Sequence, residues 1–133
     1  MISAVLIDTG PLYALSDPSD QYHRRSREEM ARLEAEGILV AVAYTTIAEA
    51  YTLVLRRLGS RYAHGWLANL QDGAIPISPD PDDYQKAVLR IQKYPDQTIT
   101  LFDALTAVLS EKLDQPVWTY DHHFDLMGVT RWN

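Results

Sequence analysis

The sequence predicts an α/β fold, a three-layer sandwich in which helices cover both faces of a mainly parallel central sheet. Short runs of apolar and often β-branched residues alternate along the chain with longer segments of helical periodicity. The first apolar run, residues 2–7, contains only one polar side chain, Ser3, as expected for a strand buried on both faces. Strands that alternate with helices in this way build parallel sheets, because each helix returns the chain to the same end of the sheet.

Glycine, proline and short polar clusters divide the chain into elements, because these residues interrupt helices and strands. In chain order we predict a strand over 2–7, helices over 10–15 and 21–36, a strand over 38–42, helices over 45–58 and 60–70, a strand over 74–77, helices over 80–92 and 100–113, a strand over 116–119, a turn or short helix over 121–127, and a last short strand over 129–132.

The positions of proline and glycine justify several of these boundaries. Pro11 and Pro81 stand in the first turns of their helices, where the missing N–H costs nothing. Gly37 and Gly59 directly follow the last helical residues, the usual place for a helix-ending glycine. Pro76 cannot donate to a strand ladder, which predicts that the strand over 74–77 lies at an edge of the sheet.

Composition points to one globular domain over residues 1–133, long enough to bury a core. The absence of cysteine excludes disulfides, thiolate metal sites and a cysteine nucleophile, and is compatible with a reducing cytoplasm. The N-terminus has no basic segment or cleavage pattern, and no apolar run approaches the ~20 residues of a membrane span. We therefore expect a cytoplasmic protein with no signal peptide and no membrane contact.

The net charge of −6 argues against a broad, sequence-independent nucleic-acid binder, which would carry a basic surface. It does not exclude a nuclease, because acidic ligands concentrated at one site can dominate the sum. Basic residues are nevertheless clustered on two helical segments. These clusters form either solvated helix faces or phosphate contacts beside an acidic pocket, and they comprise Arg24, Arg25 and Arg27, then Arg56, Arg57 and Arg61.

Four carboxylates stand in apolar contexts: Asp8, Glu49, Asp103 and Asp121. Asp8 ends the first strand, and Asp121 follows the strand over 116–119. Each acid alone has a structural explanation as a helix or turn cap. Glu49 and Asp103 lie three residues after Thr46 and Thr100, the spacing of a capping box, in which the two residues satisfy each other's backbone N–H groups.

Together the four acids indicate a metal site. Ligands of parallel sheets gather beyond the carboxyl ends of the strands. Several carboxylates brought together there cannot all remain ionised without a cation. An all-oxygen site suits Mg²⁺ or Mn²⁺, and such an ion can activate a water and neutralise phosphate charge for hydrolysis. Either one or two ions are compatible with the sequence.

These acids and their neighbours resemble the motifs of PIN domains and, more narrowly, of the VapC-type ribonuclease toxins of prokaryotic toxin–antitoxin pairs. The resemblance covers essentially the whole chain, and the ordered set of motifs is more specific than any one of them. The matching stretches are Ile7-Asp8-Thr9, Glu49 after a strand, Leu101-Phe102-Asp103-Ala104-Leu105, and Thr119-Tyr120-Asp121-His122-His123-Phe124.

The resemblance implies an Mg²⁺-dependent endoribonuclease that cuts structured RNA, either transfer or ribosomal RNA, and is blocked by a small antitoxin. By the resemblance, the four acids would be the metal-binding catalytic residues. Thr9 and Thr119 would be supporting hydroxyls that orient a carboxylate or a metal-bound water.

Several nearby residues depart from that pattern or add to it. Gly10 stands where a small hydroxyl residue is common. Tyr120 replaces a shorter polar residue, and we expect it to line the RNA path and stack on a base. Asp96 and Asp125 are further acids near the site in sequence, and we expect them to support the ligands or to lie on the surface.

The histidines do not form a recognisable ligand pattern. His122 and His123 are adjacent and so point in different directions, and no third histidine lies at ligand spacing. We expect all four histidines, including His23 and His64, to serve packing or to lie on the surface.

Other functions fit the acids less well. A phosphoaspartyl phosphatase needs a second acid two residues after Asp8, where Gly10 stands. A phosphoacceptor receiver domain needs adjacent acids after the first strand and a lysine near the last, and neither is present. A PIN-fold module that binds RNA or protein with little activity is the remaining alternative, and the presence of all four acids favours the enzyme.

An apolar stripe on the two middle helices predicts a homodimer. Its members recur at helical spacing if the two helices are nearly continuous, and they are Tyr51, Leu55, Leu58, Tyr62 and Trp66. Core packing against the sheet could instead explain the stripe. A second apolar surface already serves that purpose, formed by Ile47, Ala50, Leu53 and Val54. We therefore expect the stripe to meet another subunit, with the second arginine cluster near the seam.

Overall fold

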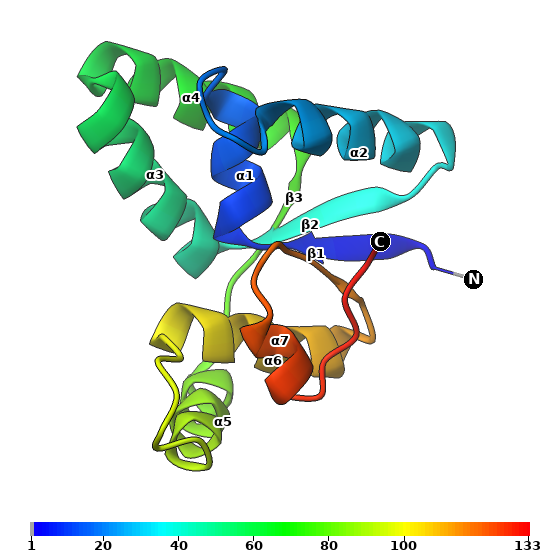
Figure 1. The fold of residues 1–133 in the computed structure, drawn as a ribbon, viewed down its shortest axis with the longest axis vertical. Coiled ribbons are helices and arrows are strands. Elements are labelled where there is room, and N and C mark those ends of the chain that lie inside the picture. Colours follow the sequence, from blue (N-terminus) through cyan, green and yellow to red (C-terminus); the bar gives the residue numbers. More distant parts are fainter. Residues whose placement is uncertain (1) are drawn as a thin grey trace.

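The computed structural model describes residues 2–133, apart from the side chain of Gln71, and has a sheet of four parallel strands at its centre (Figure 1). The strands are β1 (Ala4–Ile7), β2 (Leu39–Ala43), β3 (Ile75–Ile77) and β4 (Val117–Trp118), in the order β3-β2-β1-β4. Every pairing in this sheet is parallel. Pro76 lies in β3, an edge strand, as its missing N–H predicts.

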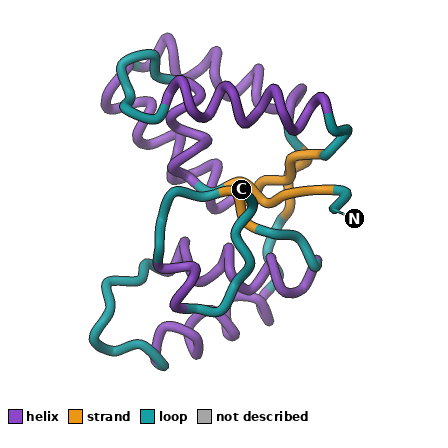
Figure 2. The backbone as a smooth tube through the Cα atoms, turned by 45° about the vertical axis from the view of Figure 1, so that its right-hand side comes forward, coloured by secondary structure: helices purple, strands orange, loops and turns teal. Residues whose placement is uncertain are grey.

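Helices cover both faces of this sheet, which confirms the three-layer sandwich (Figures 1 and 2). One layer contains α1 (Thr9–Ser16), α2 (His23–Ala35), α3 (Tyr44–Leu58) and α4 (Ser60–Gly73). The other contains α5 (Pro81–Gln92), α6 (Leu101–Leu113) and α7 (His123–Leu126). Within the described chain, none of the helices combines the length and apolarity needed to cross a membrane.

Alternating side chains of the central strands supply both cores. Val5 and Ile7 of β1 pack with Leu33 of α2 in one core. Leu6 points to the opposite face and packs with Leu109 of α6. Successive residues of a strand point to opposite faces, so a strand covered by helices on both sides must be apolar throughout. This requirement explains the continuous apolar run over residues 2–7.

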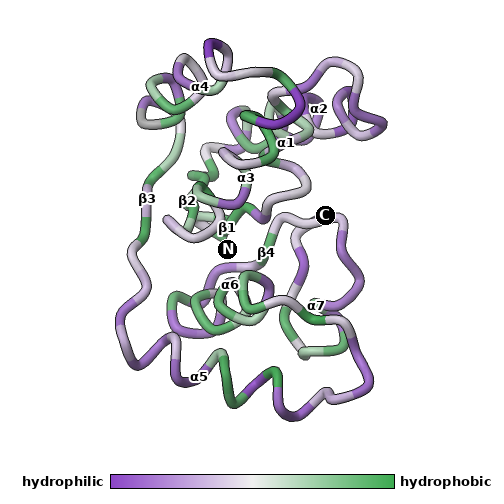
Figure 3. The backbone as a smooth tube through the Cα atoms, turned by 90° about the vertical axis from the view of Figure 1, so that its left-hand side faces the viewer, coloured by the Kyte–Doolittle hydropathy of each residue, from purple (hydrophilic) through white to green (hydrophobic). Residues whose placement is uncertain are grey.

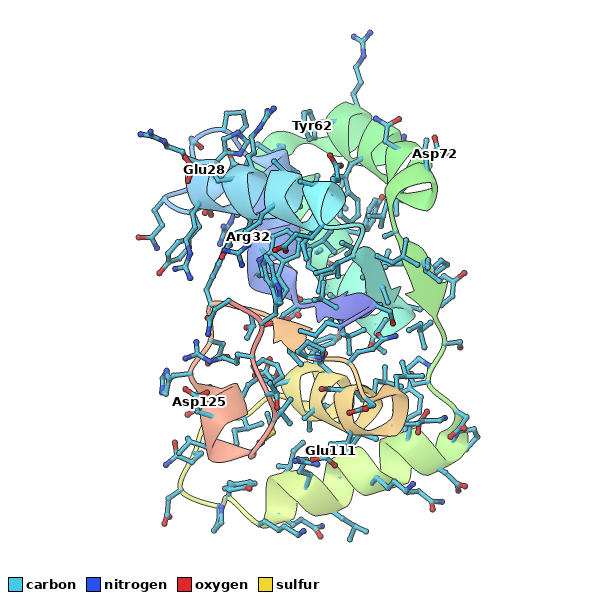
Figure 4. The ribbon with its side chains drawn as sticks, turned by 90° about the vertical axis from the view of Figure 1, so that its right-hand side faces the viewer. Glu28, Arg32, Tyr62, Asp72, Glu111 and Asp125 are labelled. Atoms are coloured by element: carbon cyan, nitrogen blue, oxygen red, sulfur yellow. The ribbon has the colours of Figure 1, made fainter. Side chains whose placement is uncertain are left out.

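The predicted elements differ from the structure mainly at their ends, with one exception at the C-terminus. The strand predicted over 129–132 is wrong, because this segment makes only an isolated bridge between Arg131 and Val117. β4 is itself two residues long, so it offers almost no ladder for another strand to extend. Packing fixes the segment instead: Trp132 lies edge-on to Trp118, and the guanidinium of Arg32 lies 4.3 Å from the centre of the Trp132 ring (Figure 4).

The parallel topology brings the carboxyl ends of the central strands to one edge of the sheet, which faces the viewer in Figure 3. β1 is followed by α1 after a single residue, and α3 follows β2 directly. The N-terminal ends of both helices therefore lie at this edge, where the sequence predicts the acidic site.

Candidate functional site

The structure brings all four predicted acids into one pocket of about 310 Å³ at the carboxyl edge of the sheet. The lining residues come from four separate parts of the chain, and they are Asp8, Thr9, Gly10, Glu49, Thr100, Asp103, Tyr120 and Asp121. Among the residues that the structure describes, no lysine or arginine lines this pocket. The negative charges therefore converge without a basic side chain in the lining to compensate them.

Asp8 and Thr119 join the ends of the two central strands. Asp8 is 6% exposed and directly follows β1. It occupies the N-cap position of α1, but within the described chain its side chain makes no capping hydrogen bond. The Thr119 hydroxyl donates to Asp8 Oδ2 at 2.8 Å and accepts from the backbone N–H of Asp121 at 3.0 Å. Thr119 thus fixes the Asp8 carboxylate and the backbone of Asp121 with one side chain.

Glu49 is held by Thr9. The helix α3 begins at Tyr44, so Thr46 lies inside the helix and is buried. The capping box that explained Glu49 as a structural alternative is therefore absent, because Thr46 does not stand at the N-cap position. Instead, the Thr9 hydroxyl donates to Glu49 Oε1 across the sheet edge.

Asp103 combines a cap with a place in the pocket. Its backbone N–H donates to the Thr100 hydroxyl at 3.1 Å, and its Oδ2 accepts from the Thr100 backbone N–H at 3.4 Å. The capping box predicted at the start of α6 is thus present. The cap holds the Asp103 carboxylate at the start of α6, and this position is also where Asp103 lines the pocket.

His123 lies beside Asp121, contrary to the expectation that all four histidines serve packing or lie on the surface. Its Nδ1 is 3.0 Å from Asp121 Oδ1, and its backbone N–H donates to the same oxygen at 2.9 Å. The side chain of His123 is 19% exposed, against 78% for His122. Adjacent histidines do point in different directions, but this leaves one of them free to face the acids. The spacing Asp-x-His was the signal in the sequence.

Burial and mutual repulsion make the ionised acids costly. Burial raises the pKa of Asp8 to about 7, the nearby Asp103 and Glu49 add to the shift, and the Thr119 hydrogen bond opposes it. Burial also raises the pKa of Glu49 and of Asp103, and Asp121 contributes to the shift of Asp103. A cation would remove the reason for these shifts, because it would favour the charged form of each carboxylate.

The donor set fits a divalent cation. Carboxylates and hydroxyls converge on one pocket without a lysine or arginine in its described lining, and burial together with the neighbouring acids raises the pKa of Asp8 and of Asp103. One donor atom each from Asp103, Asp121 and His123 lie within 4.8 Å of one another. Oxygen-rich sites of this kind suit Mg²⁺ or Mn²⁺.

Tyr120 lines the pocket, and its ring and hydroxyl contact residues of α2 and the residue just before this helix. Its hydroxyl donates to Glu29, and the Tyr22 ring lies 4.6 Å from its ring. The Arg25 guanidinium lies 4.5 Å from the centre of the Tyr120 ring. The structure thus brings one arginine of the first cluster next to the pocket, a neighbour that sequence spacing alone does not reveal.

The second arginine cluster does not line the acidic pocket. Arg57 lies over the Tyr13 ring at 4.9 Å, and Arg61 borders an apolar groove. Arg56 is exposed and follows Glu49 by seven residues on α3, which places it on the same helix face about 10 Å farther along the axis.

The two further acids considered in the sequence also lie away from the pocket. Asp96 is exposed in the loop between α5 and α6. Asp125 on α7 pairs with Arg131 at 2.9 Å on the surface (Figure 4). Neither residue belongs to the lining of the acidic pocket among the described residues.

An apolar groove of about 550 Å³ lies on the other side of α1, between α1, α2, α4 and the sheet. Its lining includes Leu12, Leu15, Met30, Trp66 and Leu70. The sequence reasoning missed this groove, because its walls come from three helices whose relative positions only the fold defines. Trp66, predicted to meet another subunit, is one of its walls.

The stripe predicted on the two middle helices is only partly exposed. Gly59, with φ of 91°, separates α3 from α4, so the helices are not continuous. Tyr51, Leu58 and Trp66 pack against a buried cluster around Tyr13. Leu55 and Tyr62 are the stripe members that remain exposed, at 37% and 47%.

Comparisons with known proteins agree with this geometry. The family model of the PIN domain matches residues 5–129. The structure of VapC20 of Mycobacterium tuberculosis, described as a toxin that cleaves the sarcin-ricin loop, is 21% identical with a TM-score of 0.83, and the match covers 96% of this chain and 98% of that one. VapBC2 of Rickettsia felis, bound to promoter DNA, is 11% identical with a TM-score of 0.77 over 98% and 97% of the two chains. FitAcB of Neisseria gonorrhoeae is 18% identical with a TM-score of 0.69 over 97% and 96%. At these identities the likeness shows the fold. No curated protein matches the sequence.

The raised pKa of Asp8 predicts how the stability of the metal-free protein depends on pH. Below pH 3.8 Asp8 is protonated in both the folded and the unfolded chain. Between pH 3.8 and about 7 the unfolded chain releases this proton while the folded chain retains it, so this contribution to the free energy of unfolding falls as the pH rises and levels off above about 7. Urea unfolding of the wild type and of Asp8→Asn at several pH values measures it.

Asp8→Asn lacks this contribution. The difference in the free energy of unfolding between the wild type and Asp8→Asn should therefore change between pH 3.8 and about 7. Saturating Mg²⁺ or Mn²⁺ should abolish this pH-dependent fall in the free energy of unfolding of the wild type, because a bound cation favours the charged carboxylate. Parallel pH profiles for the two metal-free proteins would show that Asp8 ionises in the folded chain as freely as in water.

Proposed function

The chain belongs to the PIN-domain family, and on that premise we propose that it is a divalent-metal-dependent endoribonuclease and the toxin of a type II toxin–antitoxin pair. The observation that carries the proposal is the convergence of four acids in one pocket without a lysine or arginine in its described lining, with Thr9 donating to Glu49 and Thr119 donating to Asp8. Its substrate is structured RNA, either transfer or ribosomal RNA, and its reaction is the hydrolysis of a phosphodiester bond by a metal-activated water.

In this proposal Asp8, Glu49, Asp103 and Asp121 hold Mg²⁺, and Mn²⁺ can replace it. Once bound, the ion lowers the pKa of a water and neutralises charge on the phosphate oxygens. Thr119 keeps the Asp8 carboxylate oriented, because its hydroxyl donates to Asp8 and is itself fixed by the Asp121 backbone. Thr9 has the same role toward Glu49.

We propose that RNA phosphates bind along both sides of the pocket. Arg25 stands beside Tyr120 at the pocket wall, and Arg56 lies two helical turns from Glu49 on the same exposed face. Phosphate contacts position a nucleic acid without reading its sequence. Because the Tyr120 ring already contacts Tyr22 and Arg25, its main role in this proposal is to hold Arg25 at the pocket rather than to stack on a base.

We further propose that the antitoxin docks in the apolar groove. The Klebsiella pneumoniae protein with 19% identity is a toxin–antitoxin complex, and VapBC-1 of Haemophilus influenzae has a similar fold. In this chain Leu12, Leu15 and Met30 leave an apolar groove that a short helix of a partner would fill. Only α1 lies between the groove and the acidic pocket, because residues of this helix line both. A partner chain that leaves the groove can therefore reach the acids, where an arginine would pair with them.

The first test of this function is Asp8→Asn, which removes one charge and preserves the shape of the side chain. We expect Mg²⁺-dependent cleavage of RNA to fall by at least about 100-fold, beyond the 10–100-fold typical of residues that only orient ligands. The metal-free protein should become more stable to urea, because one buried charge is removed. Fluorescent RNA cleavage and urea unfolding measure the two effects.

The matched control is Asp125→Asn, which changes an acid on the surface outside the pocket and should leave cleavage unchanged. Full Mg²⁺-dependent cleavage by Asp8→Asn would contradict the assignment of that acid. A wild type that binds the ion and RNA but cleaves no RNA would instead favour the alternative of a binding module with little activity.

The second test addresses the antitoxin groove through Gly65, which lines it on α4. A Cβ at Gly65 meets no atom within 4 Å, so Gly65→Glu blocks the groove without a steric conflict. Expression of the wild type should slow growth, and coexpression of the antitoxin gene, to be sought as a short reading frame beside this one, should relieve it. Gly65→Glu should remain toxic when that gene is coexpressed, whereas His64→Glu, outside the described groove lining, should be relieved like the wild type.

Relief of Gly65→Glu by the same gene would show that the antitoxin binds elsewhere. Harmless expression of a folded wild type that cleaves RNA in vitro would contradict the role as a toxin.

The third test concerns the homodimer, which we propose on the exposed part of the α3–α4 stripe, Leu55 and Tyr62. Sedimentation equilibrium at micromolar concentration should give twice the chain mass of 15.1 kDa. Leu55→Glu should shift the protein toward the monomer, because it places a charge in an apolar contact. Gln85→Glu, which adds a charge at an exposed position of α5 in the other helical layer, is the control and should remain dimeric. A wild type at the monomer mass would contradict the proposal.

A further inference from the structure

His123 is fixed so that its imidazole lies beside Asp121 and near Asp103, two of the acids that line the pocket. It is the first residue of α7, and its neighbour Phe124 is fully buried in the core beneath the sheet. The buried ring sets the rotation of this short helix. The His123 backbone N–H also donates to Asp121 Oδ1, which closes a turn and keeps the imidazole beside the carboxylate. The orientation of His123 is therefore a consequence of the fold. The exposed His122 lies farther from the same carboxylate, with its Nδ1 3.9 Å from Asp121 Oδ1 against 3.0 Å for His123.

The distances are close to those within one coordination sphere. Donor atoms of Asp103, Asp121 and His123 lie within 4.8 Å of one another. Two donors to one ion, each at about 2.1–2.2 Å, are separated by about 3 Å when they are adjacent and by about 4.3 Å when they are opposite, and only one pair among three donors can be opposite. A small inward shift of these three side chains would therefore place all three donors around a single ion.

Resting on the proposed metal-dependent function, we infer that His123 supplies a nitrogen ligand to the ion held by Asp103 and Asp121, and so makes the site prefer Mn²⁺ and later first-row ions over Mg²⁺. Mg²⁺ is a hard ion that binds through carboxylates and retained waters. Imidazole suits transition metals, and the affinity of a mixed nitrogen and oxygen site rises from Mn²⁺ toward Cu²⁺. One imidazole in an otherwise oxygen-rich site thus changes which ion it selects.

A different role for His123 makes different predictions. If the imidazole only donated a hydrogen bond to Asp121, it would be a positioning residue. Its loss would then weaken Mg²⁺ and Mn²⁺ binding alike, and no nitrogen would be bonded to the ion. If it is a ligand, its loss weakens Mn²⁺ binding selectively, and the bound Mn²⁺ has a directly coordinated nitrogen.

Electron paramagnetic resonance of Mn²⁺ with the full chain tests the inference independently of activity. Titration of metal-free protein gives the Mn²⁺ affinity, competition with Mg²⁺ gives the selectivity, and electron spin echo envelope modulation detects ¹⁴N bonded to Mn²⁺. We expect nitrogen modulation in the wild type and its loss in His123→Asn. We also expect a fall of about 10-fold or more in Mn²⁺ affinity, while Mg²⁺ affinity changes by less than about 3-fold.

The matched control is His122→Asn, which removes the adjacent exposed imidazole and should keep both the nitrogen modulation and the selectivity. Mn²⁺ bound to the wild type without nitrogen modulation overturns the inference and leaves the proposed metal site standing. Absence of Mn²⁺ binding overturns both. If His123→Asn fails to fold, wild type labelled with ¹⁵N-histidine decides the question, because a coordinated imidazole must change the modulation pattern and an unbound one must not.

Discussion

The cost of ionising buried carboxylates at the edge of a parallel sheet is the constraint on which the site depends. Asp8 follows a strand whose residues are buried on both faces, so its carboxylate begins in apolar surroundings. Its pKa of about 7 reports that cost, and Glu49 and Asp103 increase it. The fold supplies hydroxyl donors but no basic residue in the described pocket lining. The site therefore concentrates negative charge where a bound cation would favour the ionised carboxylates.

The same local contacts that shape the backbone also aim the acids. Asp103 completes a capping box at the start of α6, and Asp121 closes a turn with the backbone of His123. Thr119 joins β1 to the segment after β4 by contacting Asp8 and Asp121. Capping and metal binding are compatible, because a cap fixes the direction of a carboxylate while leaving acceptor capacity on its oxygens. A capping motif in the sequence is thus weak evidence against a functional role.

The helix α1 lines both the acidic pocket and the apolar groove. Its first residues, Thr9 and Gly10, line the acidic pocket, whereas Leu12 and Leu15 line the apolar groove. Only about one helical turn separates the two sets, so a ligand in the groove lies close to the acids. α2 makes a second connection, because Met30 lines the groove and its neighbour Glu29 accepts the Tyr120 hydroxyl at the pocket wall.

The sequence by itself determined the layers, the parallel sheet with Pro76 at its edge, and the convergence of the four acids, because strand alternation and the parallel topology are local and repeating properties. Tertiary structure decided the features that depend on packing between distant elements. Burial of Phe124 turned His123 toward Asp121, and packing of α2 brought Arg25 onto Tyr120. The apolar groove also depends on contacts between distant elements, because three helices define it. The strand predicted over 129–132 does not form, because β4 is too short to offer a ladder. Periodicity states which face of an element is apolar, but only the packed fold states which side chains meet across it.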